Sequence, residues 1–190
     1  MNAIIKQNGV NFGLILGFLL ALVTLIGYAV NSDILVSTWS LVYVFLTVII
    51  VGIIAIAYSK KGLGGFINFK QGFTTYFIML VIGVFISILV NFLVFNVVDT
   101  GFQEVMKEKT VEKIESQRDW IAGKMIDGGS SENEIEELEK KMDEAIEKVK
   151  TEDQYGIGKQ VQGFFTFTAF FSIFGLLLAL ILKRKDPALE

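Results

Sequence analysis

The chain has 190 residues, of which 17 are Lys or Arg and 20 are Asp or Glu, and these charges are unevenly distributed. Residues 7–32, 34–59, 71–98 and 160–182 contain no charged side chain. A soluble domain carries about 25% charged residues throughout its length, whereas an uncharged apolar run of roughly 18 residues or more is typical of a membrane-spanning helix. Four such runs in one short chain exclude a soluble globular protein.

The sequence contains no Cys and no His, which removes several kinds of site. A thiolate nucleophile, a disulfide and a Cys/His zinc site are excluded, and the most common general acid–base side chain is missing. Acidic residues near a membrane surface, Asp99 and Glu104, could serve as acid or base, but nothing in their spacing indicates it. We therefore expect no enzyme, no catalytic or metal-binding residues and no cofactor.

Four membrane-spanning helices are predicted in chain order, over about residues 12–30, 37–58, 72–98 and 161–182. The first two are separated by a short polar turn, Asn31-Ser32-Asp33. The uncharged run of the third extends over 28 residues and would measure about 42 Å as a helix, against a hydrocarbon core of about 30 Å. The third span must therefore tilt or protrude.

The basic residues near the spans predict the orientation of the chain, because Lys and Arg in short loops stay on the cytoplasmic side. In a four-span arrangement one side carries seven basic residues, and the short loop on the other side carries Asp33 with no Lys or Arg. The seven are Lys6, Lys60, Lys61, Lys70, Lys183, Arg184 and Lys185. Both termini are therefore expected in the cytoplasm and residues 99–159 outside.

Residues 60–70 combine three Lys with Leu63, Phe66, Ile67 and Phe69, a composition typical of a segment at the lipid headgroups. The Gly-rich part of this loop lacks the GxxxxGK[ST] order of a phosphate-binding loop. The basic residues at this end of the spans, Lys60, Lys61, Lys70, Lys183, Arg184 and Lys185, are thus predicted to be interfacial, and no nucleic-acid partner is expected.

Residues 99–159 differ from the spans, because they carry 17 acidic and 10 basic side chains. Ser131 and Glu134 have the spacing of a capping box, which predicts a helix over 131–150. A weaker apolar stripe predicts a second helix over 102–126, and Asp127-Gly128-Gly129-Ser130 is a turn signal between them. We expect an antiparallel helical hairpin standing on the ends of the third and fourth spans.

The predicted helix 131–150 carries a narrow apolar stripe, whose members recur at spacings of three and four residues. Such a stripe on a charged helix needs a partner helix. It can be covered by the other helix of the hairpin, or it can dock another protein or another copy, because a two-helix hairpin buries little surface alone. The candidate partner-contact residues are Ile135, Leu138, Met142, Ile146 and Val149.

Small residues at every fourth position predict close helix packing inside the membrane. One row is Gly9, Gly13 and Gly17, and a similar row in the third span is Gly83, Ser87 and Asn91. The partner of the first row can be another span of this chain or a second subunit. Asn91 and Asn96 are expected to form hydrogen bonds between helices, with a substrate contact as the alternative.

The chain resembles a bacterial family of small four-helix membrane proteins, catalogued as domain of unknown function 4199. The resemblance covers nearly the whole chain and includes Lys61-Gly62, Phe66-x-x-Phe69-Lys70-Gln71-Gly72-Phe73, Asp99-x-x-Phe102 and the terminal Lys183-Arg184-Lys185-Asp186-Pro187. Thr100 stands where the family commonly has Pro, so the third span could continue into the hairpin. The resemblance implies a bacterial inner membrane and no known catalytic residues.

The expected fold is all-α: three membrane helices in residues 1–98, a charged extracytoplasmic hairpin in 99–159, and a fourth membrane helix with a basic tail in 160–190. The expected function is that of a non-enzymatic accessory or scaffold subunit, acting in the lipid bilayer through protein contacts of the hairpin. The alternative is a component of an oligomeric small channel or transporter, with the rows of small residues at the contact between copies.

Overall fold

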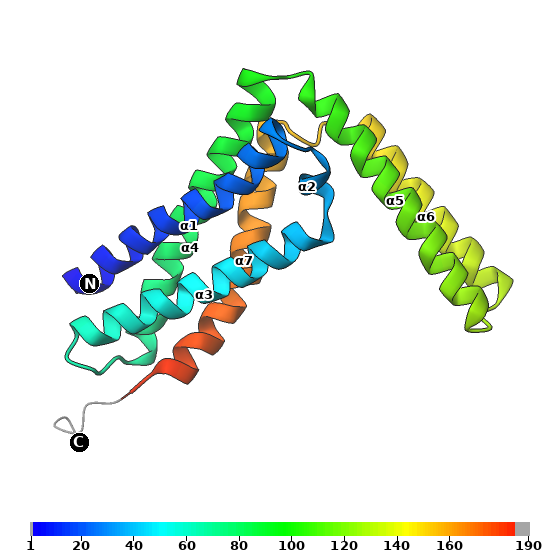
Figure 1. The fold of residues 1–190 in the computed structure, drawn as a ribbon. Coiled ribbons are helices and arrows are strands. Elements are labelled where there is room, and N and C mark those ends of the chain that lie inside the picture. The colour runs from blue at the N-terminus through cyan, green and yellow to red at the C-terminus, as the bar shows by residue number, and fades with distance from the viewer. Residues whose placement is uncertain (1, 185–190) are drawn as a thin grey trace.

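The computed structural model describes residues 2–184 and is built from helices (Figure 1). The predicted Lys185 and the other tail residues up to Glu190 lie outside the described residues. The elements in chain order are α1 (Ala3–Ala29), α2 (Asp33–Val36), α3 (Thr38–Gly62), α4 (Phe69–Leu93), the π-helix η1 (Val94–Val98), α5 (Phe102–Asp127), α6 (Glu132–Thr151) and α7 (Ile157–Leu182).

Among the described residues four helical segments are long and apolar enough to cross a membrane, which agrees with the four predicted spans. They are Ala3–Ala29, Thr38–Gly62, Phe69–Val98 and Ile157–Leu182. The boundaries differ from the prediction at several ends: α1 begins at Ala3, not near Phe12, and α3 continues to Gly62, beyond Tyr58. The hydrophobic runs mark only the apolar part of each helix, and the helices themselves extend into the flanking polar residues.

The third span ends at Val98, just before Asp99, which answers the question that Thr100 left open. The helix widens into η1 over its last five residues, and Asp99 then adopts an extended conformation with φ −148° and ψ 90°. The Asp99 carboxylate accepts a hydrogen bond from the Phe102 amide at 3.1 Å, at the start of the next helix. The span and α5 are therefore separate helices, although no Pro interrupts the chain.

The most extensive contact in the bundle joins α1 to α4. The row Gly9, Gly13 and Gly17 packs against a row of Ile side chains on α4 at the same four-residue spacing. A Cβ atom on Gly13 would lie 2.8 Å from the Ile82 Cβ atom, so no larger residue fits without movement. Of the two partners considered for this row, the structure places α4 of the same chain against it.

Tyr76 connects three helices at the centre of the bundle. Its side chain is fully buried in α4 and lies against Gly52 of α3 and Gly175 of α7, where Cβ atoms would overlap the ring. The Tyr76 hydroxyl donates a hydrogen bond of 3.0 Å to the Phe171 carbonyl of α7. Glycines on two neighbouring helices thus make the space for one large aromatic side chain, which fixes the distances between α3, α4 and α7.

The N-terminal end of α1, the α3–α4 loop and the C-terminal end of α7 lie at one end of the bundle, called here the terminal end (Figure 1). Ile67 of the loop and Arg184 after α7 exchange two main-chain hydrogen bonds, of 3.0 and 2.8 Å. Lys60 Nζ donates to the Leu182 carbonyl at 3.1 Å. These contacts hold the basic loop and the basic tail together.

The helices α5 and α6 lie side by side and extend away from the opposite end of the bundle, called here the hairpin end (Figure 1). The Glu134 carboxylate accepts hydrogen bonds from the Ser131 amide and hydroxyl at the start of α6, which is the predicted capping contact. The bond from the Ser131 amide, and to a smaller extent the bond from its hydroxyl, lowers the pKa of Glu134. The hairpin leaves the ends of the third and fourth spans and turns away to one side of the bundle (Figure 1).

We expect Gly13→Ala to reduce stability by about 1–3 kcal/mol, because the added methyl group forces α1 and α4 apart. Unfolding in mixed micelles with increasing denaturing detergent measures the change. Gly158→Ala in α7 is the matched control, because a Cβ atom there meets nothing within 4 Å. Equal stability of the two variants would contradict the close α1–α4 contact.

We expect Tyr76→Phe to reduce stability by about 1 kcal/mol, because the variant keeps the packing but loses the hydrogen bond to the Phe171 carbonyl. Tyr58→Phe is the control, since the Tyr58 side chain is 59% exposed within the chain. The same unfolding assay compares the two. A loss in Tyr58→Phe as large as that in Tyr76→Phe would refute the assignment.

Candidate functional site

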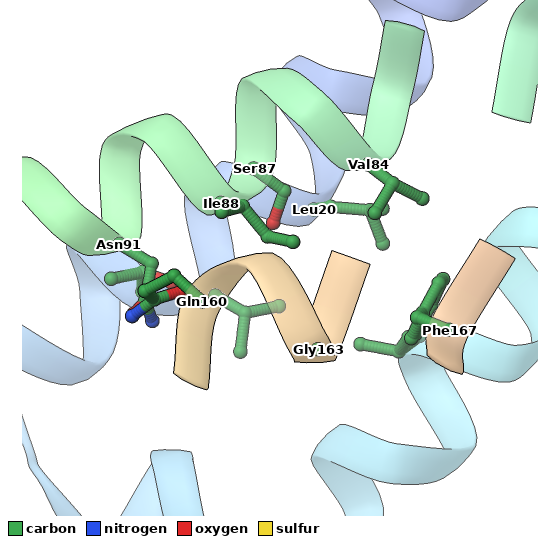
Figure 2. Close-up of a pocket in the computed structure, with 11 residues that line it drawn as sticks. Leu20, Val84, Ser87, Ile88, Asn91, Gln160, Gly163 and Phe167 are labelled. Atoms are coloured by element: carbon green, nitrogen blue, oxygen red, sulfur yellow. The ribbon is translucent and has the colours of Figure 1, made fainter. Parts of the chain in front are cut away.

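A cavity of about 300 Å³ lies among the four spans, near the hairpin end (Figure 2). Every span contributes to its wall: Leu20 from α1, Val44 from α3, Val84 from α4 and Phe167 from α7 are examples. Ligand-binding cavities are typically this large or larger, mostly apolar, and supplied with a few polar groups that orient the ligand. The cavity meets this description and is the candidate binding site of the bundle.

The polar groups of the cavity are concentrated at one end. Asn91 of α4 and Gln160 of α7 point toward one another there, while Phe167 lies at the other end (Figure 2). Gln160 Nε2 donates to Asn91 Oδ1 at 2.8 Å, which is the hydrogen bond between helices expected of Asn91. Ser87 and Thr24 add hydroxyl groups to the lining. A molecule in this cavity would meet apolar walls and one amide-bearing end.

This arrangement suits binding better than reaction. The polar side chains among the lining residues are two amides and two hydroxyls, namely Asn91, Gln160, Ser87 and Thr24. Amides neither accept nor release a proton near neutral pH, and a hydroxyl becomes a nucleophile only with an adjacent base. The lining can therefore orient a polar group by hydrogen bonds but contributes no titratable side chain to a reaction.

The base of the hairpin is held to the bundle by a polar network. Asn96 Nδ2 donates to the Tyr155 carbonyl at 2.9 Å, and Gln103 Nε2 donates to the Phe95 carbonyl at 2.7 Å. Asp99 accepts a hydrogen bond of 3.3 Å from the Tyr28 hydroxyl. These bonds link α1, the end of the third span, α5 and the segment before α7, so the hairpin is attached at several points.

Aromatic side chains fill the space around this network. Phe95 stacks on Tyr155 with ring centroids 4.4 Å apart, and Phe102 lies against Phe95 and Tyr28 at 5.3 and 5.0 Å. Burial among these rings raises the pKa of Tyr155 to about 12. The segment that enters the hairpin and the segment that leaves it are thus fixed to each other as well as to the bundle.

The apolar stripe of α6 faces α5. Ile146 is buried, and the other members, Ile135, Leu138, Met142 and Val149, are half-buried, while the charged side chains around them are exposed. Arg118 of α5 also reaches Asp143 of α6, with Nη1 and Oδ1 at 3.2 Å. Of the two uses considered for the stripe, the structure brings these residues together as the contact between α5 and α6.

The second row of small residues has two roles. Gly83 lies against Leu16 of α1, where a Cβ atom would be 2.6 Å from the Leu16 Cδ2 atom. Ser87 and Asn91 line the cavity instead.

The predicted interfacial residues Lys61 and Lys70 are exposed at the terminal end, and the Arg184 guanidinium lies 5.4 Å from the centre of the Phe66 ring.

Gln160 and Tyr76 are the important residues that sequence reasoning did not select. Gln160 stands at the boundary of an uncharged run, where a polar residue is ordinary, so only its pairing with Asn91 reveals its place. Tyr76 is surrounded by aromatic residues in sequence. A signal for Tyr76 existed in Gly52 and Gly175, but single glycines in two separate spans do not indicate which side chain they accommodate.

Comparison with known proteins supports the family and adds no activity. The model of the family described as "Protein of unknown function (DUF4199)" matches residues 11–184. No curated protein matches the chain. No solved structure matches it either. The family match covers most of the first span, the other three spans and both hairpin helices, which confirms the resemblance drawn from the motifs, and the chain therefore belongs to the DUF4199 family of proteins of unknown function.

Proposed function

We propose that this multi-pass membrane protein is a non-enzymatic accessory or scaffold subunit that acts through protein contacts of its helical hairpin. The observation that carries the proposal is the hairpin itself, a charged arm that projects from the bundle and leaves its charged side chains exposed. An arm of this kind contributes little to the packing of the spans, so contact with another molecule is the role that accounts for it.

The proposed orientation has both termini in the cytoplasm and the hairpin on the outer face of a bacterial inner membrane. The basic residues Lys60, Lys61 and Arg184 gather at the terminal end, and the positive-inside rule directs that end to the cytoplasm. The hairpin lies at the other end of the bundle (Figure 1). Its partner in this proposal is an extracytoplasmic protein or domain.

The charged surface of α6 is the proposed contact, because the apolar stripe is half-buried against α5. Glu144 lies about 160° around the helix from Met142 of the stripe and is exposed. Glu136 and Glu147 are exposed beside it. Lys140 and Lys148 lie within about 40° of Glu144, so the centre of the face carries both signs of charge, and a partner with a basic surface fits its acidic side at Glu136 and Glu147.

Photo-crosslinking in intact membranes tests this function. A photoreactive residue in place of Glu144 should give an adduct with a second protein, and the charge reversals Glu136→Lys and Glu147→Lys should abolish the adduct while the protein still inserts. Met142 is the control position, because its side chain faces α5 and should give only products within the chain. An inserted protein that forms no adduct from Glu144, or the same adduct from both positions, contradicts the proposal.

The cavity favours a second candidate function, namely a ligand-binding component of an oligomeric channel or transporter. Its apolar walls and its amide-bearing end at Asn91 and Gln160 suit a lipid-like molecule with an apolar body and one hydrogen-bonding group. The residues that line the cavity include no carboxylate and no basic side chain, so the part of the ligand in contact with them would be uncharged. Transport would require several copies around a shared path.

Native mass spectrometry of the extracted protein tests this second candidate. The wild type should retain one lipid-sized molecule, and Gly163→Leu should lose it, because a Cβ atom on Gly163 meets nothing within 4 Å and the new side chain fills the cavity. Gly158→Leu, also in open space, is the control. Asn91→Leu should weaken retention about fivefold, through loss of one hydrogen bond worth roughly 1 kcal/mol. Equal retention in all four proteins excludes the cavity as the site.

A further inference from the structure

One face of α5 is continuous with the contact between the hairpin and the bundle. Phe102 and Met106 are buried in the apolar cluster at the hairpin base, and Lys109 Nζ lies 3.0 Å from Oδ1 of Asp33, the first residue of α2. At 3.6 residues per turn these three side chains lie within about 60° of one another around the helix. This sector is therefore the side of α5 that faces the bundle.

The same sector continues beyond the bundle as a lysine–tryptophan face, defined by Lys109, Lys113, Trp120 and Lys124. Lys113, Trp120 and Lys124 fall within the same 60° or so as Phe102 and Met106. Trp120 is 67% exposed, although it stands about 27 Å along the helix from the buried Phe102. The exposed indole of Trp120 therefore lies among Lys side chains on the bundle-facing side of α5, beyond the part of the helix that contacts the bundle.

The acidic side chains of α5 lie in a different sector. Glu104, Glu108 and Glu115 are centred about 150° around the helix from the lysine–tryptophan face, and Glu112 and Asp119 fall beside them. One carboxylate, Asp127, lies in the lysine–tryptophan sector, at the last residue of the helix. Three of the five basic residues of α5 and the indole therefore lie toward the bundle side, while Lys107, Arg118 and most acidic groups lie away from it.

The direction of the hairpin determines what this face meets. The hairpin and the bundle diverge from the hairpin end like the two arms of an inverted V, and α5 is the helix that contacts α2 (Figure 1). Once the four spans are in a bilayer, the lipid leaflet at that end fills the space inside the V, beside the spans. The lysine–tryptophan face is turned into this space.

We propose that the lysine–tryptophan face of α5 rests on the phospholipid headgroups at the hairpin end. Trp residues concentrate at membrane interfaces because the ring is apolar and its N–H can be hydrogen-bonded. Lys side chains extend toward lipid phosphates, while the acidic sector remains in water. The lipid contact holds the hairpin along the membrane surface and leaves the acidic faces of α5 and α6 available to a protein partner.

The two Trp residues of the chain, Trp39 and Trp120, make the proposal directly measurable. In full-length Trp39→Phe, Trp120 is the sole indole, and its emission is compared in nanodiscs of phosphatidylethanolamine and phosphatidylglycerol with and without brominated acyl chains. Bromine quenches an indole only at short range. We expect about a twofold or greater fall in emission, because an interfacial indole lies near the acyl chains.

The matched control carries the indole on the acidic sector, in the triple variant W39F, W120F and E115W; Glu115 is exposed on wild-type α5. Its emission should change little with bromination. Lys113→Glu with Lys124→Glu in the Trp39→Phe protein should reduce the quenching of Trp120. Absence of quenching in Trp39→Phe, or equal quenching in the triple variant, overturns the proposal. The purified protein is alone in the nanodisc, so this outcome is independent of the crosslinking result at Glu144.

Discussion

The close approach of α4 to its neighbours is the constraint on which the rest of the bundle depends. Within lipid, helices gain no hydrophobic stabilisation by leaving a hydrocarbon environment for one another, so packing and hydrogen bonds must hold them together. Gly9, Gly13 and Gly17 allow α1 to lie directly on α4, and Gly52 and Gly175 accommodate Tyr76 between α3 and α7. The cavity, the hairpin base and the basic end all take their positions from this central helix.

The bundle divides its polar groups between its two ends. At the terminal end Asn8 and Thr75 donate hydrogen bonds to the Ser59 hydroxyl, at 3.1 and 3.2 Å, and so join α1, α3 and α4. At the hairpin end Asn91 is bonded to Gln160 of α7, and Asn96 is bonded to the Tyr155 carbonyl of the segment before α7. The stretch between is packed mostly with apolar side chains, and the Tyr76 hydroxyl is bonded there to the Phe171 carbonyl. This division suits a bilayer, where polar groups are least costly near the interfaces.

The four spans and the helical character of residues 102–127 and 132–151 could be predicted from the sequence, because uncharged runs and apolar periodicity are local signals. The capping contact between Ser131 and Glu134 is equally local. The pairing of Asn91 with Gln160 could not be predicted, since the two residues are 69 positions apart and their meeting depends on the rotation of two helices. The sideways direction of the hairpin is set by Asp99 and the aromatic cluster around Phe95, which involves segments distant in sequence.

The multiple attachment of the hairpin base has a mechanical consequence. A helix of 26 residues such as α5 is about 39 Å long. It is anchored near Asp99 by the hydrogen bond from Gln103 to the third span, and the third span is bonded through Asn96 to the segment before α7. A force at the tip of a rigid arm produces a torque at its fixed end, and this torque grows in proportion to the length of the arm. That torque acts on the segment around Tyr155, five residues before Gln160, so the base of the hairpin and the lining of the cavity are mechanically connected.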